Sequence, residues 1–212
     1  MDLSLILRGY IPFVISLTFH EAAHALAARL GGDNTAYLGG QVTLNPVPHM
    51  RREPFGTIVL PLLLLISTGG RQVMGWASAP IDPLWAMRHP RRAAVVSFAG
   101  PLANLLLAVV AFAVLKYALR SGVDHREGTW LAIKQISAMF LELNLLLCVF
   151  NLLPVPPLDG AGVLEGIFPR LLGPVFAAIR SQPFVMLALF FALINYGGSI
   201  YGPIIELVRG WL

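Results

Sequence analysis

Four long apolar stretches set the strongest limit on how this chain can fold. They cover about residues 4–29, 93–117, 130–152 and 184–208, and each has the roughly 20 apolar residues that a helix needs to cross a bilayer. The chain is 57% hydrophobic and 12% charged, with a mean hydropathy of +0.73, which is outside the usual range of soluble domains. The sequence therefore predicts an all-α, multi-pass membrane protein built as a bundle of about four spans.

The first stretch contains the motif His20-Glu21-Ala22-Ala23-His24. On a helix, two histidines at this spacing project from one face and can share a zinc ion, with Glu21 beside them to handle protons. Ionisable side chains inside a span are costly and usually functional. The motif therefore predicts the zinc site of a metallohydrolase.

The third stretch ends in the sequence Asn151-Leu152-Leu153-Pro154-Val155-Pro156-Pro157-Leu158-Asp159-Gly160. Its prolines break the helix and free backbone groups before the chain resumes near Ala161. Catalytic zinc usually takes three protein ligands and leaves one position open. Asp159, which follows the break, is therefore the natural third ligand beside His20 and His24.

The connections between the spans predict an orientation and some local structure. Seven arginines lie between the end of the first span and the start of the second. This excess predicts that the connection lies on the cytoplasmic side of the cell membrane, with His20 close to that side. The seven arginines are Arg29, Arg51, Arg52, Arg71, Arg88, Arg91 and Arg92. Residues 36–44 are predicted to form a small β-hairpin or edge strand near the site, because Asn45-Pro46-Val47-Pro48 cannot continue a regular helix. Residues 56–70 are predicted to form a re-entrant segment, with a short true span as the alternative.

Together these motifs resemble the site-2 protease family of zinc intramembrane metalloproteases. The family's first motif matches residues 20–24, and its Asn-x-x-Pro-x-Pro-x-Leu-Asp-Gly motif matches residues 151–160. Gly100-Pro101-Leu102-Ala103-Asn104 is similar to the family's start of the intervening span. The interval 40–83 is similar to the compact branch without accessory domains, so residues 1–212 are expected to form one protease domain. Ala161 stands where many members have a second glycine.

The resemblance implies a zinc endopeptidase that hydrolyses transmembrane or membrane-associated segments within the bilayer, with one Zn²⁺ held by His20, His24 and Asp159. Glu21 would take a proton from water and pass it to the leaving amine. Asn151 would donate its amide to the oxyanion, with a helix-end cap as the alternative role.

The partners implied are the lipid bilayer and a membrane protein whose helix can unwind; nucleic acid is not expected. Val42, in the predicted edge strand, is a candidate for holding the unwound substrate by strand addition, and residues 75–81 are a second possible edge. Asn104 is a candidate substrate-binding residue close to the metal, and a helix–helix hydrogen bond is its alternative role. His49, His89 and His125 are expected at the surface without a metal role.

Three other functions stay open at this point. A non-catalytic metal-binding or client-binding membrane protein would be expected to lack the base or a ligand, and neither is lacking here. A secondary transporter would commonly show repeated halves, and each motif occurs once. A membrane zinc peptidase for soluble peptides would take a later glutamate as third ligand, for which Glu165 is the nearest candidate.

Overall fold

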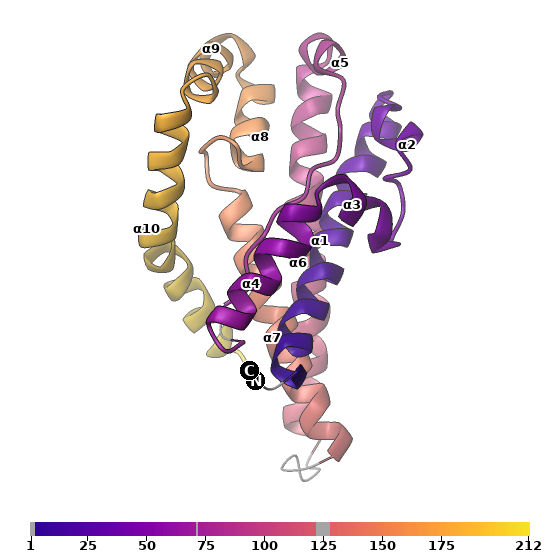
Figure 1. The fold of residues 1–212 in the computed structure, drawn as a ribbon, viewed down its shortest axis with the longest axis vertical. Helices are drawn as coiled ribbons and strands as arrows, with labels where there is room; N and C mark the ends of the chain where they lie inside the picture. The colour runs from indigo at the N-terminus through magenta and orange to yellow at the C-terminus, as the bar shows by residue number, and fades with distance from the viewer. Residues whose placement is uncertain (1–2, 71, 122–127) are drawn as a thin grey trace.

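The computed structural model describes residues 3–70, 72–121 and 128–212, and all regular elements in these ranges are helices (Figure 1). The long helices are α1 (Leu3–Gly31), α6 (Pro90–Arg120), α7 (Gly128–Asn151) and α10 (Pro183–Arg209). The shorter ones are α2 (Thr35–Leu38), α3 (Pro46–Arg52), a π-helix (Phe55–Val59), α4 (Leu60–Ser67), α5 (Pro83–Arg88), α8 (Asp159–Ile167) and α9 (Pro169–Arg180).

Three helices in the described ranges are long and apolar enough to cross a membrane: residues Arg8–Gly31 of α1, and the whole of α6 and α7. Residues Pro169–Arg180 and Pro183–Leu189, bent by 98° where α9 meets α10, would make a fourth if they count as one span. The expected all-α membrane bundle is therefore confirmed, with three to four candidate spans.

Helix α6 is the centre of the bundle and packs against α1, α7 and α8. A cluster of buried residues from α6, α7 and α10 forms one core: Ala108, Ala111, Leu115, Leu141, Leu145 and Ile205. The alanines allow the helix backbones to approach closely, as is common in membrane proteins. Helix α10 joins this core near its C-terminal end, where Tyr201 donates to the carbonyl of Glu142 at 2.9 Å and Arg209 pairs with the Glu142 carboxylate.

The segment between α3 and α5 runs along α1 and then turns back toward its own start. The π-helix and α4 together have 13 residues, about 20 Å of helix, which is too short for a hydrocarbon core of about 30 Å. After a turn at Gly69 and Gly70, both with positive φ, the chain returns in an extended conformation, and the Trp76 amide donates to the Gly56 carbonyl at 3.1 Å. The backbone at Trp76 therefore lies beside Gly56 in the π-helix, and whether this segment re-enters the membrane or crosses it stays a prediction.

The predicted β-hairpin at residues 36–44 is wrong for the described chain. Thr35–Leu38 forms a helical turn, and Val42 is half-buried in a bend without a strand partner. Asn45 and Pro46 begin a helix, because the Asn45 side chain accepts from the Val47 amide at 3.0 Å and proline fits the first helical position. The Asn-Pro pair was a helix-start signal, and no edge strand is present here to bind substrate.

The buried carboxylate of Asp33 fastens the end of α1 to the start of α5. One oxygen accepts from the Thr35 amide at 2.9 Å and the Thr35 hydroxyl at 2.6 Å, and the other accepts from the Asp82 amide at 2.9 Å. Burial by itself would raise the pKa of Asp33, but these hydrogen bonds outweigh it and hold the pKa below its usual value. The chain that leads into α5 is thus tied to the end of α1.

We expect Asp33→Asn to lower the thermal midpoint in detergent, because the amide nitrogen would face the Asp82 N–H; the cost is about 1–3 kcal/mol. Asp82→Asn is the matched control and should be nearly neutral, since Asp82 caps α5 by accepting from the Leu84 amide and asparagine caps equally well. Because the folded pKa is lowered, the Asp33 contribution is present above its unfolded pKa of about 3.9 and is lost as the pH falls through the folded pKa. Equal midpoints for the two variants at neutral pH would contradict this role.

Candidate metal centre

The structure brings His20, His24 and Asp159 together between α1, α6 and α8. One donor atom from each of these residues lies within 4.8 Å of the other two, and no other such group of three occurs among the residues searched, which are those the structure describes. His20 and His24 are 5% and 7% exposed. Asp159 is the first residue of α8. The predicted ligand set therefore forms one compact cluster.

Hydrogen bonds on the far side of each imidazole fix its orientation. His24 Nδ1 lies 2.7 Å from the Val96 carbonyl oxygen, which can only accept, so Nδ1 carries the proton. His20 Nδ1 lies 2.6 Å from Asn104 Oδ1, which likewise accepts. In the neutral rings both Nε2 atoms therefore carry lone pairs, and they face each other at 3.0 Å. Two lone pairs at this distance repel unless a cation lies between them.

The donor spacing fits a zinc ion. His20 Nε2 lies 3.1 Å from Asp159 Oδ2, and His24 Nε2 lies 3.3 Å from Asp159 Oδ1. A tetrahedral ion with bonds of about 2.0 Å separates its ligand atoms by roughly 3.3 Å. Asp159 Oδ2 is buried without a hydrogen-bond partner in the described chain. The geometry and the nitrogen and oxygen donors thus meet the requirements of Zn²⁺.

Glycines let the backbones of α6 and α8 reach the cluster. A Cβ atom at Gly100 of α6 would lie 2.3 Å from His24 Nε2 and 2.6 Å from His20 Nε2. At Gly160 it would lie 2.2 Å from the Leu152 carbonyl oxygen, where α8 folds back on the end of α7. Ala161, by contrast, is 1% exposed inside α8, so the departure from the family motif is accommodated.

We expect Gly100→Ala to weaken zinc binding more than it disturbs the bundle, because its methyl group would push both imidazoles from their positions. Competition with a coloured chelator would measure the affinity, and a thermal scan in detergent would measure the fold. The matched control is Gly198→Ala in α10, where a Cβ atom meets nothing within 4 Å. Unchanged zinc affinity in Gly100→Ala would mean that the histidines can move away at little cost.

Glu21 lies next to His20 in the sequence of α1 and is 3% exposed. Its Oε2 atom is buried without a hydrogen-bond partner in the described part of the chain. A buried carboxylate oxygen without a partner is costly, and a catalytic role is one explanation for such a group. This is the residue that the sequence motif predicts as the general base.

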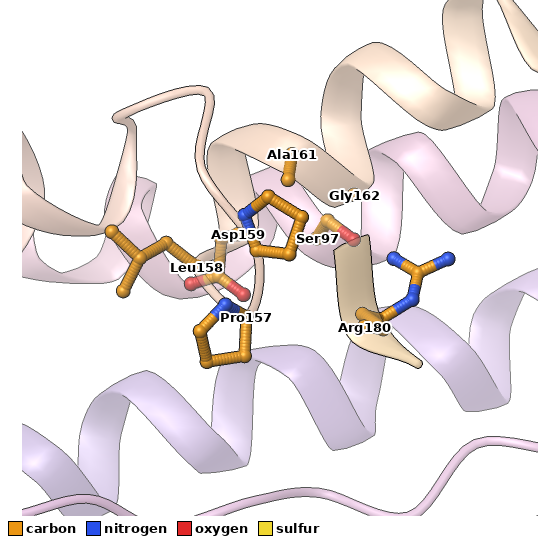
Figure 2. A pocket seen from close by; sticks show the side chains of 8 residues that line it. Ser97, Pro157, Leu158, Asp159, Ala161, Gly162 and Arg180 are labelled. Carbon is orange, nitrogen blue, oxygen red and sulfur yellow. The ribbon is translucent and has the colours of Figure 1, made fainter. Parts of the chain in front are cut away.

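A cavity of about 150 Å³ opens beside Asp159. It is lined by Ser97, Pro156, Pro157, Leu158, Asp159, Ala161, Gly162 and Arg180 (Figure 2). In Figure 2, Arg180 stands at the other end of this group from Leu158 and Asp159. Arg180 makes two hydrogen bonds of 2.9 Å to the carboxylate of Glu165. Glu165 is thus engaged with Arg180 and is not part of the donor cluster.

Two other predicted residues have different surroundings. Asn151 is half-buried, and its amide donates to the Leu147 carbonyl in its own helix at 2.9 Å, so its oxyanion role stays a prediction. Asn104 is fully buried, with its oxygen on His20 and its nitrogen on Asn144 at 2.8 Å. Asn104 therefore orients the His20 ring through a helix–helix contact, and a direct contact of Asn104 with substrate stays a prediction.

The surface prediction for the three histidines is wrong for His49. His49 is 3% exposed, and its Nε2 lies 3.0 Å from the Thr43 carbonyl oxygen. His89 precedes α6, with its ring 5.8 Å from that of Trp85. His125 lies outside the described residues, as does Arg71. No histidine besides His20 and His24 belongs to the described metal cluster.

Known proteins are similar to this chain over most of its length. The model of the family described as Peptidase family M50 matches residues 9–194. The putative zinc metalloprotease YwhC of Bacillus subtilis (strain 168) is 37% identical over 209 residues, 98% of this chain and 90% of that protein. The putative zinc metalloprotease Rip2 of Mycolicibacterium smegmatis is 35% identical over 165 residues, 76% of this chain and 56% of that protein. The putative zinc metalloprotease Rip2 of Mycobacterium tuberculosis (strain H37Rv) is 32% identical over 193 residues, which are 91% of this chain and 69% of that protein. No solved structure gives a significant match.

Proposed function

The chain belongs to peptidase family M50, the site-2 protease family, and from this premise we propose that it cuts other membrane proteins inside the bilayer. The family, the relatives and the apolar helices establish a zinc metalloprotease that is integral to the membrane and crosses it several times. Our proposal concerns the position of the scissile peptide bond relative to the membrane. The scissile bond belongs to a transmembrane or membrane-associated segment.

The depth of the ligand cluster carries this proposal. Arg92 Nη1 donates to the Gly31 carbonyl at 3.1 Å, so the end of α1 and the start of α6 lie together. His20 is eleven residues from Gly31, and Gly100 is ten residues from Pro90, so both lie about 15–17 Å from that end. The two helices, with 29 and 31 residues, are about 44–47 Å long, against a hydrocarbon core of about 30 Å. A site at this depth lies below the headgroups.

Charge supports a cytoplasmic location for the nearer end. Arg29 lies in the last turn of α1 and Arg91 and Arg92 in the first turn of α6, at this end of the bundle, and Arg51, Arg52 and Arg88 lie in the short helices that the intervening chain forms. Cytoplasmic loops carry such an excess of positive residues. Water would then reach the site from the cytoplasm through the cavity beside Asp159. We place the protein in the cell membrane on the same argument.

In the proposed mechanism His20, His24 and Asp159 would hold one Zn²⁺. Zinc bound there supplies Lewis acidity, which polarises a carbonyl oxygen and acidifies water. Glu21 takes a proton from the attacking water and returns it to the leaving amine nitrogen. The second N–H of the Asn151 amide is available to the developing oxyanion, because the amide has two donors and Leu147 uses one. Burial of Glu21 keeps bulk water away from this proton transfer.

The substrate must be locally unwound before it is cut. A transmembrane helix keeps its carbonyl groups in its own hydrogen bonds, and only an opened stretch can present one to the cluster. The proposed partner is therefore a membrane protein whose helix opens easily, for example at Gly or Pro. The lipid bilayer is the second partner, because it delivers the substrate sideways.

The test is to find where the purified enzyme cuts. The substrate would be a single-span protein with a helix-breaking residue in its span, reconstituted in vesicles, and mass spectrometry would identify the products. We expect cleavage inside the span, and slower cleavage when the helix breaker is replaced by leucine. Cleavage only in exposed linkers, or only of soluble peptides with the same sequence, would instead favour the soluble-peptide protease. Zinc binding without hydrolysis of either substrate would favour the non-catalytic reading.

A further inference from the structure

A chain of fully buried polar side chains leads from His20 away from the metal cluster. Asn104 of α6 and Asn144 of α7 are both 0% exposed, as is Ser16 of α1. Asn104 Nδ2 donates to Asn144 Oδ1 at 2.8 Å, and Asn144 Nδ2 donates to Ser16 Oγ at 2.9 Å. The chain thus joins three helices in the middle of the bundle and ends on a metal ligand.

The contacts of Asn144 fix which atom donates and which accepts in each of these hydrogen bonds. Asn144 Nδ2 also lies 2.9 Å from the Phe140 carbonyl oxygen, which can only accept. Asn144 must therefore turn its oxygen toward Asn104. Asn104 must then present its nitrogen to Asn144 and its oxygen to His20 Nδ1. The Ser16 carbonyl, at 3.4 Å from Asn104 Nδ2, gives only weak additional support for this orientation.

We propose that Asn144 is a positioning residue that determines which ring nitrogen of His20 faces the metal. An Asn104 amide rotated by 180° would present N–H groups to His20 Nδ1. That nitrogen would then have to accept, the proton would move to Nε2, and Nε2 could no longer bind a cation. Asn144 prevents this rotation without contacting His20. The inference uses the metal site of the proposed function, but it does not depend on which substrate is cut.

The variants Asn144→Leu and Asn144→Asp separate orientation from packing. Leucine cannot accept from Asn104, and we expect zinc affinity to fall by about 10-fold, the lower end of the range for residues behind a ligand. Aspartate keeps an oxygen toward Asn104 whether or not it is protonated, so its zinc affinity should stay within about twofold of wild type. A purely structural role predicts the reverse order, because a buried carboxylate disturbs packing more than leucine does.

The matched control is Asn195→Leu. Asn195 of α10 donates to the carbonyl of Phe191 at 2.8 Å, four residues earlier, as Asn144 does to Phe140, but it is exposed. This variant should keep wild-type zinc affinity. The double variant Asn104→Leu/Asn144→Leu should bind zinc no more weakly than Asn104→Leu alone, because Asn144 acts through Asn104.

Two measurements on the full-length protein in detergent decide the matter. Chelator competition gives the zinc affinity, and ¹⁵N NMR of histidine-labelled, zinc-free protein reports which nitrogen of His20 carries the proton. We expect the Nδ1–H form in wild type and Asn144→Asp, and a mixture in Asn144→Leu. The proposal is overturned if Asn144→Leu lowers only the thermal midpoint, if Asn144→Asp binds zinc less well than Asn144→Leu, or if the double variant shows additive losses.

Discussion

Glu21→Gln should abolish proteolysis while leaving the zinc site loaded. Glutamine has nearly the same shape but cannot accept and return a proton, and general-base catalysis typically contributes about 10²–10⁴-fold. We therefore expect cleavage of a single-span substrate to fall by at least about 100-fold. Zinc content should not change, because Glu21 is not part of the donor cluster. The thermal midpoint should not fall, since the substitution removes a buried carboxylate whose Oε2 has no partner in the described chain.

The control for this experiment is Glu206→Gln, which changes an exposed glutamate of α10 outside the cluster. It should cleave the substrate at the wild-type rate. If Glu21→Gln kept more than a tenth or so of wild-type activity, another group would have to serve as the base, since a lost general base typically costs about 10²-fold or more. If it lost zinc, Glu21 would belong to the ligand set, and its assigned role would be wrong.

Asp159→Ala should lose both zinc and activity. Its carboxylate oxygens lie 3.1 Å and 3.3 Å from the two histidine Nε2 atoms, and two imidazoles alone leave a zinc ion short of a protein ligand. The drop in affinity should exceed the about 10–100-fold loss that follows changes behind a ligand. The metal content of dialysed protein, measured by elemental analysis, gives the result directly.

Glu165→Ala is the matched control, because it removes a carboxylate of the same helix that pairs with Arg180 at 2.9 Å. It should keep its zinc, and any change should be in substrate binding at the cavity that Arg180 lines. Zinc lost from Glu165→Ala and kept in Asp159→Ala would reverse the assignment. That result would restore the soluble-peptidase interpretation, in which a later glutamate is the third ligand.

The ligand cluster could be predicted because its information is local. The spacing of His20 and His24 requires only a helix, and Asp159 follows a proline break that must turn the chain inward. The apolar stretches likewise predicted the long helices to within a few residues. Residues 159–180 have no such long stretch, so hydropathy alone does not predict α8 and α9.

The remaining features of the site and fold depend on contacts between segments that are far apart in the sequence. The Asn104–Asn144 hydrogen bond joins two helices whose relative rotation is set by packing of the whole bundle. His49 lies in a polar sequence, yet α3 and its connections bury it. The error at residues 36–44 had a local cause, because the Asn45-Pro46 pair that cannot continue a preceding helix can begin a new one.

The burial of the ligand cluster has a consequence for which substrates the proposed protease can cut. His20 and His24 are 5% and 7% exposed, and an intact helix keeps its carbonyl groups in its own hydrogen bonds. Only the opened form of a substrate can then compete for the site, and a helix that is open 1% of the time binds about 100-fold more weakly than one that is always open. Substrates would be ranked by helix stability more than by sequence. A protease of this design would preferentially remove membrane proteins that are poorly folded or have lost their partners.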